Sequence, residues 1–522
     1  MALRRPDSDC DHKPYGPELC EALRLTEQQR VNSPDMKHCI TARSGAALHI
    51  IILLPLLVGS LLAGCTVGPD YKRPEVLVPA SWQKVDDASG SIANLKWWQL
   101  FEDPTLQKLI RTALKDNYDL QLAVARVAEA RALLGIAHSA QFPNLNAGSR
   151  YRNDRESETS FPPIDKLGVN PNFDLYRADL QTSFEVDLWG RLRRATEAAR
   201  AELLANEENQ RTVLMTLVAD VAQNYFDLLE LDREAEIDRR TLASRRASLD
   251  LVSRRYDDGL ASELDVKRAE EELASAEATV PDVERRIAQT ENRLRIFLGE
   301  NPGPIPRTAS LDSEHMPPEI PAGLPSALLE QRPDIRAAEE HVVAANARIG
   351  EAKAEFFPQI SLTGVFGSAS VSLSDFFTGP SRMWSAGPTV TLPIFNAGRL
   401  SSNLAATEAR EQQSRIQYRQ AIQQAFQEVD DALVFHQKAR AIRLQRERQV
   451  QAAEQALALA NLRYTNGVSS YLDVLDTERQ LFSAEINLAT ITRDQLNAVV
   501  QVYKALGGGW DADLPVGRNI QP

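Results

Sequence analysis

One cysteine lies where a specific chemistry can be predicted. An apolar run, Leu48–Ala63, follows a basic stretch and leads through Gly64 into Cys65. Such a run is typical of a signal peptide and is short for a transmembrane helix. Small residues before a cysteine suit a lipoprotein signal peptidase, and the Cys65 thiol is the nucleophile that would take a diacylglyceryl group. We therefore predict a lipoprotein signal peptide over 36–64 and a lipid on Cys65. A signal anchor that ends in Cys by chance is the alternative.

The flanks of this segment indicate the compartment. Residues 1–35 are polar and contain four prolines, which does not fit ahead of a signal peptide, so we expect Met36 to be the start and 1–35 to be a non-native upstream extension. Thr66 follows the cysteine, at the position where an Asp would favour retention in the inner membrane of a Gram-negative cell. The expected location is the outer membrane, with a lipid-anchored chain that extends into the periplasm.

Composition and spacing exclude several classes of protein. All four cysteines lie at or before Cys65, so the mature chain has no thiols for a disulfide and must be stabilised by packing. A net charge of −13 makes the chain a poor binder of nucleic acid. His138, His341 and His436 stand singly in helical patterns, and the sequence has neither a P-loop nor an HExxH motif. We expect no enzyme, no metal and no cofactor apart from the covalent lipid.

The chain contains an internal duplication. Arg255–Glu277 returns 208 residues later as Arg463–Glu485, with twelve of twenty-three positions identical. In each copy two long helical patterns are joined through a short break that contains a glycine. Each copy is therefore predicted to be a helical hairpin.

The elements that carry this repeat can be read from their periodicity. Apolar residues recur at alternating steps of three and four, which indicates a left-handed coiled coil. The first arms are expected over Leu192–Arg255 and Leu400–Arg463, each about 95 Å long, and Pro281 in the second arm predicts a kink. A generic coiled-coil rod would explain the heptads, but it would not explain the shared Arg-Tyr-x-x-Gly-x-x-Ser-x-Leu-Asp-Val.

Strand patterns precede each hairpin. Ala178–Leu188 alternates strictly between apolar and polar residues, and Pro143–Tyr151, Pro358–Ser370 and Trp384–Ile394 alternate more loosely. Their length suits transmembrane barrel strands. Four strands cannot close a barrel, and a sheet in lipid cannot leave open edges. Since known barrels need at least about eight strands, two to four chains must assemble.

Taken together, these residues resemble the TolC-like outer membrane factors, and among them the OprM and NodT type of outer membrane efflux lipoprotein. Beyond the duplicated motif, the resemblance rests on Cys65-Thr66-Val67-Gly68-Pro69-Asp70-Tyr71, Asp187-Leu188-Trp189-Gly190-Arg191, Arg332-Pro333-Asp334, Phe356-Phe357-Pro358 and Phe395-Asn396-Ala397-Gly398-Arg399. It implies an α+β membrane protein: a homotrimer whose twelve-stranded outer-membrane β-barrel, with four strands from each chain, continues into a periplasmic α-helical coiled-coil barrel.

The resemblance also implies roles for the duplicated motif. The two turns would be tips at which a periplasmic adaptor protein docks, through Arg255, Tyr256, Gly259, Arg463 and Gly467. A glycine turn by itself says nothing about docking, because any helical hairpin can use one.

The second copy would line a gate. Asp473 and Asp476 are similar to the acidic rings of the family, with Leu472 as a hydrophobic constriction and Tyr464 as an interchain hydrogen-bonding tie. The first copy has Arg268 at the position of Asp476, which favours unequal roles for the two hairpins. The alternative is that these acids are solvated charges on a helix face.

The implied function is a passive conduit. It would export small molecules such as drugs and toxic organic compounds, with energy supplied through the adaptor by an inner-membrane pump, expected to be of the RND type. Protein secretion of type I and oligosaccharide export use the same architecture and stay open. A structural periplasmic lipoprotein could use the coiled coils but would not need lipid-facing strands. Only five methionines occur, which gives no support to a methionine-based copper route.

The expected domain plan follows the repeat. An N-terminal segment and the first repeat occupy 65–300, a proline-rich linker 301–325, the second repeat 326–506 and a C-terminal tail 507–522.

Overall fold

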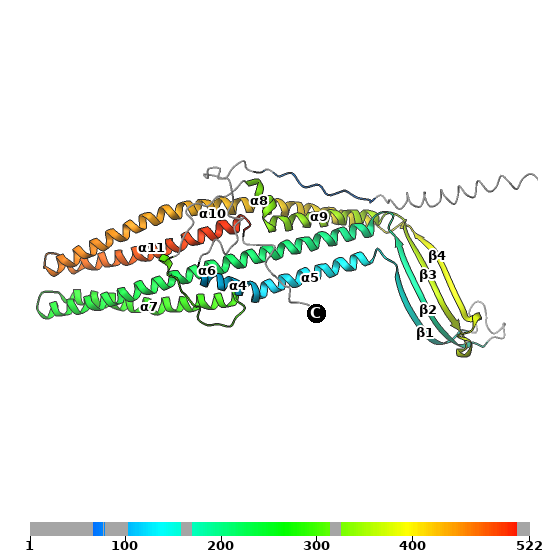
Figure 1. Cartoon of the computed structure of the whole chain (residues 1–522), viewed down its shortest axis with the longest axis horizontal. Coiled ribbons are helices and arrows are strands. Elements are labelled where there is room, and N and C mark those ends of the chain that lie inside the picture. Colours follow the sequence, from blue (N-terminus) through cyan, green and yellow to red (C-terminus); the bar gives the residue numbers. More distant parts are fainter. Residues whose placement is uncertain (1–65, 77, 79–102, 158–169, 314–324, 509–522) are drawn as a thin grey trace, which may run out of the picture. The chain divides into compact units, whose positions relative to one another are not determined.

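A computed structural model describes residues 66–76, 78, 103–157, 170–313 and 325–508 (Figure 1). The predicted signal peptide, Cys65, the residues before Met36 and the tail beyond 508 lie outside the described residues, as does 314–324 of the predicted linker. The described part of that linker contains one short 3₁₀ helix, Leu311–Ser313.

Helices and strands follow the same order in both halves of the chain. The first half contains α4 (Pro104–Asp116), α5 (Tyr118–Ser139), β1 (Asn144–Arg155), β2 (Asn172–Val186), α6 (Arg191–Asp257) and α7 (Glu263–Phe297). The second half contains α8 (Pro325–Gln331), α9 (Pro333–Ala354), β3 (Gln359–Ser370), β4 (Arg382–Thr391), α10 (Arg399–Thr465) and α11 (Tyr471–Ala505). The predicted duplication and its two helical hairpins are confirmed.

The long helices match the predicted arms closely. Helices α6 and α10 each have 67 residues, and α7 and α11 each have 35. Helix α7 continues through Pro281, and the kink expected there stays a prediction. None of the helices in the described residues combines the length and the apolar character needed to cross a membrane.

The four strands form one antiparallel sheet in the order β1-β2-β3-β4. Its register lines up apolar side chains from all four strands: Ala147 is opposite Leu180, Leu180 is opposite Phe366, and Phe366 is opposite Trp384. Leu180, Phe366 and Trp384 are all exposed. Because side chains alternate between the two faces of a sheet, this row defines one apolar, uncovered face.

The opposite face of the sheet is polar. Asp179 lies there, opposite Gly148 of β1 and Gly367 of β3. Its carboxylate accepts hydrogen bonds of 2.6 Å from both Arg177 and Gln181. The sheet is therefore amphipathic, with one apolar and one polar surface.

The main hydrophobic core joins helices from both halves. Tyr225 of α6 is completely buried, and its hydroxyl donates to the Asp103 carboxylate at 2.5 Å. Asp103 also caps α4 by accepting from the Thr105 backbone N at 2.7 Å. Around Tyr225, apolar side chains of all eight helices from α4 to α11 form one cluster.

Residues 66–70 run beside the start of α6. The Val67 backbone N donates to the Trp189 carbonyl at 3.0 Å, and Arg194 of α6 binds Asp70 at 2.8 Å. Trp189 follows β2 and precedes α6. The first described residues are thus held at the junction between the sheet and the helices.

Candidate gate and docking tips

The two long hairpins end in turns of the same geometry. Helix α6 ends just before Gly259 and α10 just before Gly467, and both glycines have φ +75°. In the first turn, Gly259 N donates to the Tyr256 carbonyl at 2.9 Å and Leu260 N to the Arg255 carbonyl at 2.7 Å. The second turn makes the same two bonds, each 3.0 Å long. This is the Schellman ending of a helix, which glycine reaches without strain, so the repeated Arg-Tyr-x-x-Gly encodes where each arm stops.

Most of the predicted docking residues are accessible. Tyr256, Gly259, Arg463 and Gly467 are exposed, and Arg255 is partly buried. Their position at the turns is as expected from the sequence, and their role in docking stays a prediction.

The two turns differ in how the returning helix begins. In the first, the Ser262 hydroxyl accepts from Asp265 N at 3.2 Å, and the Asp265 carboxylate accepts from Ser262 N at 3.2 Å, which is a complete capping box. In the second, Ser470 occupies the same position but makes no side-chain cap. The equivalent acid, Asp473, is therefore not held by a capping bond.

The predicted gate acids share one exposed face of α11. Leu472, Asp473 and Asp476 are exposed, whereas Val474 and Leu475 between the two acids are buried. This face points away from the core of the hairpin tips. A position on an uncovered face is compatible with a gate and equally with solvated charges, so the assignment stays a prediction.

Tyr464 lies inside the chain. It is 6% exposed, and the Arg255 guanidinium lies 4.6 Å above its ring. Arg255 Nη1 also donates to the Tyr464 carbonyl at 3.3 Å. The Tyr464 hydroxyl is buried without a hydrogen-bond partner among the described residues. An interchain bond from this hydroxyl, as predicted from the sequence, would therefore require the side chain to leave its present packing.

A buried ion cluster ties the two hairpins together above the turns. Arg245 of α6, whose side chain is 4% exposed, binds Glu478 of α11 and lies 3.2 Å from Glu272 of α7. Glu272 in turn accepts from Arg479 Nε of α11 at 2.7 Å. Three helices thus share two arginines and two carboxylates.

Tyr471 closes the cluster on the side of the turn. Its ring centroid lies 5.5 Å from that of Tyr464. Burial, with the negative charge of Glu478 adding to it, raises the pKa of Tyr471 to about 12. Burial thus makes loss of the Tyr471 proton harder than for an exposed tyrosine.

The sequence did not reveal this cluster. Charged residues at Arg245, Glu272 and Glu478 look like ordinary surface charges of a coiled coil, because each lies beside the apolar stripe of its own helix. Only the contact of α11 with α6 and α7 makes them partners, and no pattern within one helix encodes that contact.

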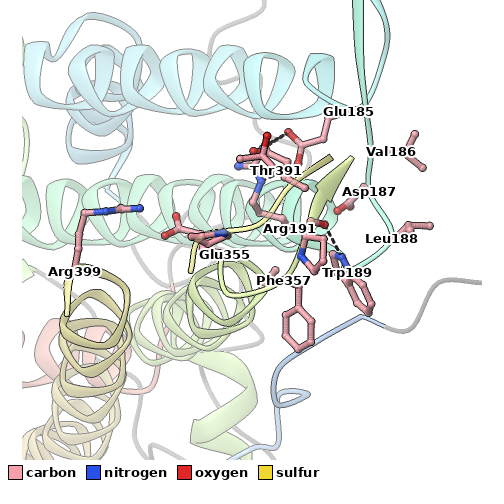
Figure 2. Close-up of a pocket in the computed structure, with 14 residues that line it drawn as sticks. Glu185, Val186, Asp187, Leu188, Trp189, Arg191, Glu355, Phe357, Thr391 and Arg399 are labelled. Atoms are coloured by element: carbon pink, nitrogen blue, oxygen red, sulfur yellow. Dashed lines mark hydrogen bonds and ion pairs between the residues drawn. The ribbon is translucent and has the colours of Figure 1, made fainter. Parts of the chain in front are cut away.

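A second constellation of motif residues lies at the junction of sheet and helices (Figure 2). Trp189 stacks on Phe357 at 4.7 Å, and its Nε1 donates to the Pro358 carbonyl at 2.9 Å. Arg191 makes two bonds, of 3.0 and 2.7 Å, with the Glu185 carboxylate. These residues line a cavity of about 340 Å³. They join β2 to α6 and to the start of β3.

The described residues contain no group of three or more potential metal-ligating side chains.

Comparison with known proteins gives consistent matches. The family model described as outer membrane efflux protein matches residues 109–300 and 324–508. The toluene efflux pump outer membrane protein TtgI of Pseudomonas putida is 39% identical over 470 residues, which cover 88% of this chain and 98% of that protein. The cation efflux system protein CusC of Escherichia coli is 36% identical over 464 residues, covering 88% and 99%.

Solved structures agree in fold. A membrane protein from Pseudomonas aeruginosa superposes with a TM-score of 0.79 at 36% identity, covering 87% of this chain and 99% of the other. The open state of the MtrE outer membrane channel of Neisseria gonorrhoeae superposes with a TM-score of 0.76 at 34% identity, covering 85% and 98%. This chain therefore belongs to the outer membrane efflux protein family, whose members are transport proteins of the outer membrane and not enzymes.

Proposed function

We propose that this protein is the outer membrane channel of a tripartite efflux system, a passive trimeric conduit for small molecules. The observation that carries the proposal is an amphipathic four-stranded sheet joined to two long coiled-coil hairpins. One element suits contact with lipid, and the other suits a duct through the periplasm.

The sheet supports a barrel shared between chains. In the part of the chain that the structure describes, β1 and β4 each have one neighbouring strand, so each leaves one edge unpaired. Unpaired backbone groups in lipid cost several kcal/mol each. Three copies would pair all edges in a twelve-stranded barrel, with the apolar row of Leu180, Phe366 and Trp384 facing lipid and Asp179 facing water.

Efflux of small organic molecules is favoured over other cargo. TtgI is named for toluene, and CusC for cations. The similarity to TtgI makes toxic organic compounds the proposed cargo, with a periplasmic adaptor at the hairpin tips and an inner-membrane pump of the RND type as the source of energy. The gate is proposed to be formed by Leu472, Asp473 and Asp476, held by Tyr464.

Loss of the chain tests this function directly. Cells that lack it should accumulate more of a fluorescent efflux dye than the parent, and a plasmid copy should restore export. Affinity purification after cross-linking in the same cells should recover one adaptor and one inner-membrane pump. Unchanged accumulation in cells that express that adaptor and pump would contradict the proposal.

The proposed lipid on Cys65 has its own test. Val67 is bonded to Trp189 at the sheet end of α6, which suits an anchor at the membrane boundary. Cys65→Ser should lose label from radioactive palmitate but still insert, since about 0.8 kcal/mol per buried methylene is secondary to a complete barrel. Equal labelling of variant and parent would reject the lipoprotein assignment.

A further inference from the structure

The duplication provides a map of contacts between repeats. Each residue of the first hairpin has its equivalent 208 positions later in the second. Within the chain, three arginines of α6 reach the second repeat. Arg245 binds Glu478 in the buried cluster described above. Arg240 forms an ion pair with Glu485, and Arg255 contacts Tyr464. These contacts show how a first repeat meets a second repeat.

In a ring of three chains, which rests on the function proposed above, each second repeat also meets the first repeat of the next copy. The equivalents of Arg240 and Glu485 are Arg448 and Glu277. Both repeats thus have an arginine at the first position and a glutamate at the second. The equivalents of Arg255 and Tyr464 are Arg463 and Tyr256, again an arginine and a tyrosine.

We propose that Arg448 and Arg463 of one copy bind Glu277 and Tyr256 of the next copy, repeating between chains the contacts that Arg240 and Arg255 make within a chain. The partner of this surface is therefore a second copy of the same chain. Arg463 would lie over the Tyr256 ring and donate to backbone carbonyls at the end of the neighbouring α6.

The proposal requires Tyr256 and Glu277 to be accessible to another copy, and both are more exposed than their equivalents. Tyr464, which has its arginine in the chain, is 6% exposed, whereas Tyr256 is 44% exposed. The Glu485 side chain is 12% exposed, whereas that of Glu277 is 49% exposed. In each pair, the residue whose proposed partner lies on another copy is the more open one.

Another contact between the repeats is a hydrogen bond, and the equivalent residues could form an ion pair between chains. Glu230 of α6 accepts from the Thr490 hydroxyl of α11 at 3.3 Å. Their equivalents, Lys438 and Asp282, carry opposite charges and are both exposed. Lys438 lines an open groove of about 420 Å³ along α10 together with Ile442 and Arg446, and we assign this groove to the neighbouring α7.

The buried cluster around Arg245 has no equivalent in the proposed contacts between chains. The equivalents of Arg245 and Glu478 are Ala453 and Glu270, and Glu270 binds Lys267 of its own helix at 3.0 Å. Ala453 thus stands where the cluster within the chain has its buried arginine. The junction between chains should therefore be the weaker one near the tips.

Cysteine cross-linking on separate chains tests the proposal. The mature chain has no cysteine beyond Cys65, so introduced thiols report without background. Full-length protein is co-expressed from two alleles, one with Arg448→Cys and one with Glu277→Cys, and membranes are treated with a short bifunctional thiol reagent. A covalent dimer of the two alleles is expected, and neither allele alone should give one.

The matched control uses the pair within the chain. Arg240→Cys and Glu485→Cys on separate alleles should give no dimer, and a dimer from that combination would overturn the map. A missing dimer from Arg448→Cys with Glu277→Cys, when an amine-reactive reagent still gives trimers, would overturn the inference alone. If the amine-reactive reagent stops at monomers, the proposed trimer fails and the inference falls with it.

Charge reversal gives an independent readout. Arg448→Glu should lower the temperature at which the detergent-extracted trimer dissociates, and Glu277→Arg on the same chain should restore it. Failure of the second change to restore the dissociation temperature would contradict direct pairing of these residues.

Discussion

The two long hairpins have the same backbone but different surroundings. Both have arms of 67 and 35 residues and both turn at a glycine with φ +75°. The first turn is locked by its own capping box, whereas the second is not. The second hairpin buries Tyr464 and Tyr471 against the first and leaves Asp473 and Asp476 uncovered. The shared residues thus encode the hairpin, and the residues that differ determine what each hairpin can do.

The largest effect is expected where the hairpins are joined. Arg245→Ala would leave the buried carboxylates of Glu272 and Glu478 without their shared cation, which costs about 3–5 kcal/mol for a buried pair. We expect a large drop in the free energy of unfolding, measured by denaturant titration of the detergent-extracted protein. The matched control is Arg239→Ala, because the Arg239–Glu284 pair is exposed on both sides and such pairs contribute only about 0–1 kcal/mol. Equal losses for the two variants would mean that the cluster does not join the hairpins.

The capping difference predicts an unequal response to the same change. Ser262→Ala removes a complete capping box and should cost about 1 kcal/mol. Ser470→Ala should cost much less, because the Ser470 side chain caps nothing in this structure. Hydrogen exchange of the first turn of α7 and of α11 in the two variants measures the effect locally. Similar deprotection of both turns would show that the hairpins start their second arms in the same way.

The smallest predicted effect depends on pH. Asp238 of α6 is 1% exposed, and neither of its carboxyl oxygens has a hydrogen-bond partner within the described part of the chain. The facing Thr279 hydroxyl of α7 donates to Ala276 instead, and the charges nearby are Glu234, Arg239 and Arg286. Burial, followed by the negative charge of Glu234, raises the pKa of Asp238 from 3.8 to about 6.

The sign of the pH effect follows from this shift. Because the folded state holds the proton more tightly, the stabilising contribution of Asp238 is complete below pH 3.8 and is lost as the pH rises through about 6. Asp238→Asn should therefore raise the melting temperature at pH 8, and the gain should shrink at pH 5. The second hairpin has Arg446 at this position, so Arg446→Gln should show no such pH dependence. A gain of equal size at both pH values would contradict the assignment.

Local pattern was sufficient for the long helices and insufficient for the strand ends. Ala178–Leu188 was the predicted strand, but β2 runs over Asn172–Val186, because pairing with β1 continues to Arg155 opposite Asn172 after the apolar alternation stops. In β4 the alternation continues to Ile394, yet the strand ends at Thr391. Pairing stops there because Thr391 is opposite Gln359, the first residue of β3.

In the candidate site, too, local features could be predicted from the sequence, whereas contacts between helices could not. The turns at Gly259 and Gly467 could be predicted because a Schellman ending needs only local residues. The contact of Arg255 with Tyr464, and the position of Arg245 between two carboxylates, depend on which helices lie side by side. Such contacts become visible only when the hairpins are placed together. The structure buries the Tyr464 side chain within its own chain, and its bond between chains stays a prediction.

Single-channel recording in planar bilayers tests the central claim most directly, namely that the protein is a conduit whose second hairpin forms the gate. Divalent or trivalent cations added on the side of the hairpin tips should block the current of the purified protein. Asp473→Ala combined with Asp476→Ala should relieve that block, because the uncovered acids of three chains would converge there. Asp257→Ala combined with Asp258→Ala, which removes two exposed acids from the first turn, should leave the block unchanged. Block that persists unchanged in the Asp473/Asp476 double variant would contradict the account.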